Sequence, residues 1–390
     1  MNKKLLNSEL VEEMIDFRRW MHQNPELSEM EEKTAAKICR LLEKYNIEYR
    51  NNVGGHGVVA LIRGKRPGKT VAAKADMDAL PITEKNNCAF KSANVGVMHA
   101  CGHDANTAIL LGTAIYLKSL ADELCGNIKI FFESAEETIG GGKQMVADGC
   151  MSNPTVDKII GLHVMPHLKT GIVEVKKGCL NASTNEVEIT IKGKGGHAAE
   201  PEVCVDPIVT MSYVITALQS FVSRNTGPTQ SAVLTFGVLQ SGTKGNIIPD
   251  TAFARGTLRT LKADQREFAK KRVKEIAEST AEAFGAIAEV KLTDSYDAVI
   301  NQDDIVDVII EEATEIYGKD NVVYKEEPSM GAEDFSYYTK EADGAYFHIG
   351  CKNPDETEVC NLHTGSFRLD ERCIENGIRI QVAVLIKMME

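Results

Sequence analysis

The sequence lacks three features that mark large classes of protein: a long hydrophobic run, a strongly basic segment and a paired-cysteine motif. No stretch of the 390 residues reaches the roughly 18 consecutive apolar residues of a membrane-spanning helix, so we expect no membrane partner. Lys and Arg number 44 against 56 Asp and Glu, which gives a net charge of −12. Basic runs are short, as at residues 270–272, so we expect no nucleic-acid partner.

The amino-terminal segment also lacks the apolar core of a signal peptide, because Asn7, Ser8 and Glu9 interrupt it. None of the ten cysteines belongs to a C-x-x-C pair. In a reducing compartment, scattered cysteines of this kind are free and pack as small hydrophobic residues. We therefore expect a cytoplasmic protein in which at most one or two cysteines carry chemistry.

The first half of the chain alternates between helical and strand patterns. Apolar spacing predicts helices over residues 9–22, 31–45 and 107–120, and strands over residues 58–62, 71–75, 128–132 and 159–162. Continuous apolar strands separated by helices are typical of a mostly parallel sheet that is covered on both faces. We therefore expect an α/β domain, with ligands bound at the carboxyl ends of its strands.

The pattern changes near residue 184. It predicts strands over residues 187–191, 232–239, 251–258 and 289–292, with one helix after the first strand and one before the last. Asp206 with Pro207 is a helix-start signal, and Asp264 with Glu267 resembles a capping box. The order βαββαβ indicates a small antiparallel α+β domain. We expect this inserted domain over residues 184–294, between two catalytic-domain segments at 1–183 and 295–390.

Two of the candidate site segments place polar residues two positions apart. Asp76 and Asp78 follow an apolar strand and share a face in extended chain, although a polar strand end explains them equally well. Cys101 and His103 also share a face if the chain there is extended, so both could bind one metal ion. A single C-x-H pair remains a weak signal.

A third segment contains two adjacent acids, Glu136 and Glu137, just after an apolar strand. Buried carboxylates cost free energy unless they bind something. Neighbours in a strand point in opposite directions, so both acids can serve one site only if the strand has ended, which the glycines at 140–142 would allow. One acid could then bind a metal while the other takes a proton from water.

Two histidines complete the set. His163 ends the apolar run 159–162, and His363 lies in a turn-rich loop. Each alone is more often a hydrogen-bonded structural residue than a ligand. Taken together, however, Cys, His, Glu, Glu and His in an α/β chain are the donors that a metal-dependent hydrolase needs.

With these motifs the chain resembles the M20 metallopeptidase family, in the branch of N-acyl-amino-acid amidohydrolases, hippurate hydrolases and auxin-conjugate hydrolases. The resemblance begins near Phe17 and extends to the carboxyl terminus. It rests on HQNPELS (22–28), DMDALP (76–81), HACGHD (99–104), AEE (135–137), LHV (162–164), GKGGHAAEP (193–201), GNIIP (245–249), MGAEDF (330–335) and LHT (362–364). That many motifs in the same order make the resemblance specific.

The resemblance implies an active site with two divalent ions, Zn²⁺ or Mn²⁺ first, with Co²⁺ or Ni²⁺ as further options. The matching metal ligands are Cys101, His103, Glu137, His163 and His363. Glu136 matches the general base, and Asp78 matches an acid that orients a ligand.

The resemblance also gives the inserted domain a role in dimerisation and as a lid. His197 matches a histidine that reaches the active site of the neighbouring subunit, where it would donate to the oxyanion. Asn246 and Arg259 fall where the family places substrate contacts. The implied assembly is a homodimer, or a dimer of such dimers.

The implied reaction is hydrolysis of the amide bond of a small N-acyl-L-amino acid by water, with Glu136 as the general base. Within the family, an N-acetyl-diaminopimelate deacetylase or a dipeptidase is an alternative. A thiol hydrolase with Cys101 as nucleophile and His103 as base is a different class, and residues at i and i+2 seldom have the geometry it needs. A non-catalytic binding protein is a further alternative, which the retention of both Glu136 and Glu137 disfavours.

Overall fold

The computed structural model describes residues 6–354 and 356–390, and these divide into two units. The first unit contains the chain up to Leu180 together with Ile300–Glu327 and Asp334–Glu390. The second contains Asn181–Val299 and Pro328–Glu333. Each unit has its own hydrophobic core. In the part of the chain that the structure describes, no helix combines the length and hydropathy needed to cross a membrane.

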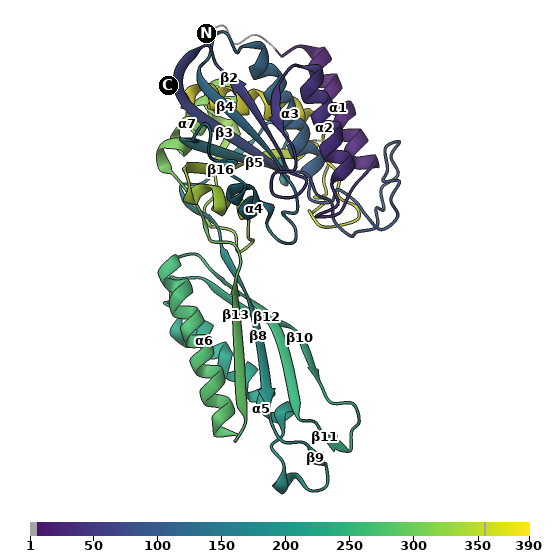
Figure 1. Ribbon diagram of the computed structural model, residues 1–390, viewed down its shortest axis with the longest axis vertical. Coiled ribbons are helices and arrows are strands. Elements are labelled where there is room, and N and C mark those ends of the chain that lie inside the picture. The colour runs from purple at the N-terminus through teal and green to yellow at the C-terminus, as the bar shows by residue number, and fades with distance from the viewer. Residues whose placement is uncertain (1–5, 355) are drawn as a thin grey trace. The chain divides into compact units, whose positions relative to one another are not determined.

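An eight-stranded sheet forms the centre of the first unit, in the order β1-β2-β4-β3-β5-β16-β6-β15 (Figure 1). The strands are β1 (Glu48–Arg50), β2 (Val58–Arg63), β3 (Arg66–Asp76), β4 (Cys125–Glu133), β5 (Lys158–Lys169), β6 (Val173–Val175), β15 (Val322–Tyr324) and β16 (Asp343–Lys352). The four central strands run parallel, whereas β1, β2 and β6 pair antiparallel with their neighbours toward the centre. The mostly parallel sheet expected from the apolar runs is therefore confirmed.

Helices cover the sheet because successive strand residues alternate between its faces. The helices are α1 (Ser8–Gln23), α2 (Glu32–Lys44), α3 (His103–Ser119), α4 (Gly141–Ala147), α7 (Asp303–Tyr317) and α8 (Arg372–Met388), with 3-10 turns η3 (Lys319–Asn321) and η4 (Asp334–Lys340). Ile130 and Phe132 of β4 join the large core that also contains residues of α1, α2, α3, α7 and α8. Phe131 points the other way and stacks on Tyr338 of η4, with ring centroids 5.6 Å apart.

The second unit has the expected βαββαβ plan, with an antiparallel sheet in the order β10-β12-β8-β13 (Figure 1). Its elements are β8 (Ser183–Lys192), β9 (Gly196–His197), η1 (Pro201–Val203), α5 (Pro207–Ser220), η2 (Phe221–Asn225), β10 (Ala232–Ser241), β11 (Ile247–Ile248), β12 (Thr251–Thr260), α6 (Ala263–Ala283) and β13 (Ile287–Asp294). The short strands β9 and β11 pair with each other, as do β7 (Gly178–Asn181) and β14 (Val299–Asn301). The α+β prediction is confirmed.

The two helix-start signals of this unit had different outcomes. Asp206 caps α5 as predicted, since its side chain accepts hydrogen bonds from the backbone N–H groups of Ile208 and Val209. The prediction of a capping box that begins at Asp264 was wrong. Helix α6 begins at Ala263 with Lys262 in the cap position, two residues before the predicted cap, so Asp264 lies inside the first turn, where its side chain accepts the N–H of Gln265.

Candidate metal centre

The five side chains that the sequence predicted as metal ligands lie together in the first unit. Their donor atoms form overlapping groups, and within each group all atoms lie within 4.8 Å of one another. The groups are Cys101–His103–His163, Cys101–Glu137–His363 and His103–Glu136–Glu137. Because Cys101, His103 and Glu137 each belong to two groups, the cluster is continuous and offers more donors than one tetrahedral ion takes.

His163 lies inside strand β5, opposite His348 of β16, and the prediction that it ends its strand was wrong. The pairing of β5 with β3 stops at Gly161, two residues earlier, so the two strands separate where the site begins. The Nδ1 atom of His163 lies 2.8 Å from the carbonyl oxygen of Val164, to which it donates. Burial lowers the pKa of His163, so its Nε2, 3.5 Å from Cys101 Sγ, carries a lone pair.

Cys101 and His103 converge, but by a different geometry from the extended chain that the sequence suggested. Gly102 has φ 88°, in the left-handed region, and α3 begins at His103. Any Cβ at this glycine would lie 2.6 Å from Val164 Cγ2, so both the backbone and the packing require glycine. A left-handed residue followed by a helix start turns the two donors toward one point.

Cys101 is a thiol in the absence of a cation. Burial raises the pKa of Cys101 to about 12, although His103 beside it opposes the shift. The Nε2 atom of His363 lies 3.3 Å from Cys101 Sγ. A buried thiol with a raised pKa is a poor nucleophile, which disfavours the thiol-hydrolase alternative, whereas a bound metal would deprotonate it.

Asp78 lies at the centre of the hydrogen bonds behind the cluster. Its Oδ1 is 3.2 Å and its backbone oxygen 3.0 Å from Nδ1 of His103, which leaves Nε2 of that ring to face the site. Its Oδ2 accepts hydrogen bonds from Ser28 Oγ at 2.7 Å and from the backbone N–H of Glu137 at 3.0 Å. Although burial opposes it, these donors keep the pKa of Asp78 below its usual value.

The turn that carries the two adjacent acids is made by an alanine. Strand β4 ends at Glu133, and Ala135 has φ 62°. The glycines at 140–142 begin α4, and the N–H of Gly140 donates to the carbonyl oxygen of Ala135 at 3.0 Å, so they close the loop after the two acids while the turn itself lies at Ala135. Glu137 Oε1 lies 3.3 Å from His363 Nε2, and although burial opposes it, that imidazole lowers the pKa of Glu137.

Asp76 belongs to a separate buried cluster. Its Oδ1 lies 2.6 Å from Lys74 Nζ, and the same ammonium is 3.2 Å from Asp334 Oδ1. Tyr338 donates to Glu133 at 2.6 Å on the other side of the cluster. The face shared by Asp76 and Asp78 in extended chain therefore does not bring them into one site, because strand β3 ends between them.

The other three predicted residues lie in the second unit. His197 is in β9 and exposed, and its Nδ1 accepts the N–H of Ala199 at 3.1 Å. In the neutral ring the proton therefore sits on Nε2. Asn246 is exposed just before β11, and Arg259 is half-buried in β12, donating to the backbone oxygen of Met330 at 3.2 Å. Their roles stay predictions.

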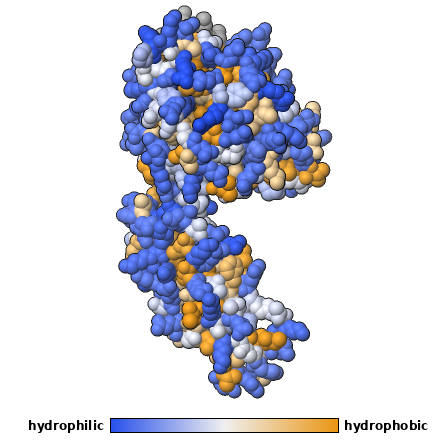
Figure 2. Space-filling model, viewed as in Figure 1, coloured by the Kyte–Doolittle hydropathy of each residue, from blue (hydrophilic) through white to orange (hydrophobic). Residues whose placement is uncertain are grey.

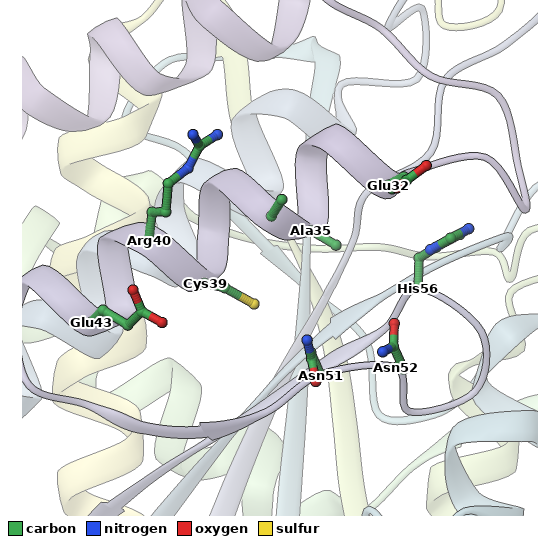
Figure 3. Close-up of a pocket in the computed structure, with 9 residues that line it drawn as sticks. Glu32, Ala35, Cys39, Arg40, Glu43, Asn51, Asn52 and His56 are labelled. Atoms are coloured by element: carbon green, nitrogen blue, oxygen red, sulfur yellow. The ribbon is translucent and has the colours of Figure 1, made fainter.

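A surface pocket of about 480 Å³ lies elsewhere in the first unit (Figure 3). Its lining comes from α2 and from the chain near residues 51–56: Glu32, Ala35, Ala36, Cys39, Arg40, Glu43, Asn51, Asn52 and His56. Acidic, basic and amide side chains alternate around it, and it shares no residue with the ligand groups. This pocket therefore does not coincide with the donor groups around Cys101.

Comparisons with known proteins show which family the chain resembles. Residues 72–387 match the sequence model of Peptidase family M20/M25/M40. The chain is 37% identical to thermostable carboxypeptidase 2 of Saccharolobus solfataricus, over 99% of this chain and 98% of that protein. It is 38% identical to the N-acetyl-L-cysteine deacetylase of Bacillus subtilis, over 94% of this chain and 86% of that protein.

A solved structure shares the fold as well as the sequence. The YXEP protein of Bacillus subtilis, described as a dinuclear metal binding peptidase from the M20 family, superposes with a TM-score of 0.85. The two are 33% identical, and the match covers 98% of this chain and 99% of that one. The chain therefore belongs to peptidase family M20/M25/M40 and is a hydrolase of that family.

Proposed function

We propose that this protein is a metal-dependent amidohydrolase that cleaves the amide bond of small N-acyl-L-amino acids. The observation that carries the proposal is the cluster of five donors around Cys101 with an additional carboxylate, Glu136, at its edge. Five donors in overlapping groups suit two divalent ions with open positions for water and substrate. The dinuclear M20 relative supports the same stoichiometry.

The donor chemistry fits this class of ion. One sulfur, three imidazoles and one carboxylate are ligands for borderline metals rather than for Mg²⁺ or Ca²⁺. His163 presents a neutral ring with a free Nε2, and the pKa of Glu137 is lowered, so both have the protonation state that a ligand needs. We propose Zn²⁺ or Mn²⁺ as the resident ions, with Co²⁺ or Ni²⁺ as substitutes.

Glu136 and Asp78 would have different roles in the hydrolysis. Bound divalent ions would polarise the scissile carbonyl and lower the pKa of water. Glu136, whose carboxylate lies within 4.8 Å of the donor atoms of His103 and Glu137, takes the proton from the attacking water and returns it to the leaving amine nitrogen. Asp78 holds the ring of His103 and the main chain of Glu137 in place.

The second unit would complete the site in a homodimer. His197 carries its neutral-ring proton on Nε2, the donor that an oxyanion requires, and Asn246 and Arg259 would contact the substrate. Figure 2 shows hydrophobic patches on the visible surface of this unit. Exposed apolar side chains lie on α5 and on the edge strand β10: Ile208, Val209, Tyr213, Val238 and Leu239. An apolar helix beside an open strand edge favours pairing with a second copy.

The proposal also includes the kind of acyl group that is removed and the cellular compartment of the protein. The N-acetyl-L-cysteine deacetylase relative supports small N-acetyl amino acids as substrates. The carboxypeptidase relative supports a second candidate, hydrolysis of a short peptide with a free carboxylate. Among the described residues, none of the ten cysteines forms a disulfide, which supports a reducing compartment such as the cytoplasm.

The decisive experiment removes metal with EDTA, restores one ion at a time and measures release of free amino acid. The substrates are N-acetyl-L-cysteine, other N-acetyl and N-benzoyl amino acids, N-acetyl-diaminopimelate and dipeptides. We expect EDTA to abolish hydrolysis, Zn²⁺ or Mn²⁺ to restore it, and N-acyl amino acids to exceed dipeptides in kcat/KM. Activity that survives EDTA and is lost to iodoacetamide would overturn the proposal in favour of the thiol mechanism.

A further inference from the structure

Glu31 is a buried acid that the reaction above does not use. It directly precedes α2 and is 0% exposed, yet its side chain does not cap that helix. Its Oε1 instead accepts the backbone N–H of Ala135 at 2.8 Å. No hydrogen-bond partner of Oε2 is found among the described residues. A buried carboxylate with so few donors is costly, so a helix start alone does not explain it.

Ala135 sets the direction of the turn after β4 that carries Glu136 and Glu137. It is 2% exposed and has φ 62°, a conformation that residues with a side chain rarely adopt. Its carbonyl oxygen accepts the N–H of Gly140 at 3.0 Å, and its own N–H goes to Glu31. Glu136 and Glu137 follow it directly. The left-handed residue is thus held by one hydrogen bond on each side.

We propose, on the basis of the amidohydrolase function above, that Glu31 is a positioning residue that holds the Ala135 turn and thereby aims the general base Glu136. Burial, together with the nearby carboxylate of Asp78, raises the pKa of Glu31 to about 7. The carboxyl group of Glu31 can accept a hydrogen bond in both its ionised and its protonated form, so the contact with Ala135 survives protonation.

The two acids of the turn should depend on Glu31 to different degrees. The main chain of Glu137 has its own anchor, the 3.0 Å hydrogen bond to Asp78 Oδ2. Glu136 directly follows Ala135, so the direction of its backbone depends on the left-handed conformation that Glu31 helps to hold. Loss of the Glu31 contact should therefore misplace Glu136 and leave the metal ligand Glu137 close to its position. The expected signature is a fall in kcat without loss of metal.

Three substitutions and one control separate positioning from folding. Glu31→Gln keeps an acceptor of the same shape, whereas Glu31→Met removes the acceptor at similar volume. Glu31→Asp keeps the acid but is one methylene too short to reach Ala135. This variant replaces Glu31→Met as the test of the lost contact if the methionine variant does not fold. The control is Glu32→Met, because Glu32 is the next residue, is exposed and lines the surface pocket of Figure 3.

The first readout is amide hydrogen exchange of the metal-free proteins in peptides covering residues 134–137. We expect Glu31→Met and Glu31→Asp to accelerate exchange there roughly tenfold, and Glu31→Gln and Glu32→Met to leave it near the native rate. Equal exchange in all proteins would overturn the proposal. This measurement needs no substrate, so it stands even if the amidohydrolase function fails.

The second readout is steady-state kinetics with metal content measured on the same samples. We expect Glu31→Met to lower kcat by roughly 10- to 100-fold at unchanged KM and metal content, with Glu31→Gln restoring most of kcat. A methionine variant that only melts earlier, with native kcat per folded molecule, would make Glu31 structural and overturn the proposal. Absence of amide hydrolysis in the native protein would instead count against the proposed function.

Discussion

The backbone N–H of Glu137 donates to Oδ2 of Asp78 over 3.0 Å. This bond joins the end of β3 to the turn after β4, so a residue from one strand fixes the main chain of an acid from the next. Because the bond uses the backbone, the Glu137 carboxylate remains available beside His363. The main chain of Glu137 therefore has an anchor in Asp78 that does not occupy its carboxylate, and we expect different consequences when Glu136 and Glu137 are changed.

Glu136→Gln should retain both metal ions and lose roughly 10²–10⁴-fold in kcat, the usual contribution of a positioned acid or base. Glu137→Gln should lose metal first, because a neutral amide replaces a ligand whose pKa His363 holds low. Metal analysis of dialysed proteins together with kinetics checks both expectations. If Glu136→Gln loses metal and Glu137→Gln keeps it, the roles are reversed.

The sequence predicted most of the fold because the elements are strongly patterned. The continuous apolar runs around Ile130 and Ile160 can be buried on both sides only in a covered, mostly parallel sheet. The start of α5 was predictable because Asp206 and Pro207 satisfy local rules. Asp264 failed because Lys262, two residues earlier, occupies the cap position, and a shift of two residues is invisible to a pattern of acidic spacing.

The site was predictable as a set of side chains but not as a geometry. Cys101, His103 and Glu137 have the right chemistry, yet their convergence depends on left-handed backbone at Gly102 and Ala135. Glycine signals the first position, but alanine gives no signal for the second. Glu31 carried no signal either, because its role depends on a contact with a residue 104 positions away.

Cys101 should lose its proton when metal binds. Its pKa of about 12 means that the metal-free protein holds it as a thiol at pH 8, whereas a ligand must be a thiolate. Metal affinity should therefore rise with pH across the neutral range. Calorimetry of Zn²⁺ binding in buffers of different ionisation enthalpy should show release of at least one proton per subunit.

Alkylation provides an independent check on the same residue. Bound metal should slow labelling of Cys101 by a thiol reagent, whereas Cys88, which is half-buried and outside the ligand groups, should label equally in both forms. Mass spectrometry resolves the two sites. Equal labelling of Cys101 with and without metal would argue against its assignment as a ligand.

Glu31 should make stability depend on pH. Burial raises its pKa from 4.5 to about 7, so the folded protein binds more protons there than the unfolded chain between these values. Stability from this group is therefore fully present below pH 4.5 and is lost as the pH rises from 4.5 through 7, by on the order of 3 kcal/mol. Glu31→Gln has no carboxyl group to ionise at this position, so it should not lose stability in this way. At pH 8 its free energy of unfolding should exceed that of the native protein.

Urea unfolding in EDTA at pH 5 and pH 8 measures this difference without a contribution from metal. The native protein should lose more stability between the two pH values than Glu31→Gln does. The exposed neighbour Glu32 provides the control, since Glu32→Gln should follow the native curve. Parallel curves for all three proteins would mean that Glu31 keeps an ordinary pKa.

His197 should act in the active site of the partner subunit. Its Nδ1 is occupied by the N–H of Ala199, which leaves Nε2–H to donate to the developing oxyanion. His197→Ala should therefore lower kcat roughly 10²–10³-fold, as removal of one such donor does, with native metal content. A loss of metal in this variant would place the histidine among the ligands instead.

Mixing two inactive variants tests whether the histidine acts across a dimer. In a heterodimer of Glu136→Gln with His197→Ala, one site pairs Glu136 of the second subunit with His197 of the first and is complete, while the other site lacks both groups. Subunit exchange should therefore restore one native site per heterodimer, with native KM. Mass spectrometry of the intact dimers confirms that exchange has occurred. If activity does not return in a mixture that has exchanged, His197 works within its own subunit or outside catalysis, because only action in trans makes the two defects complementary.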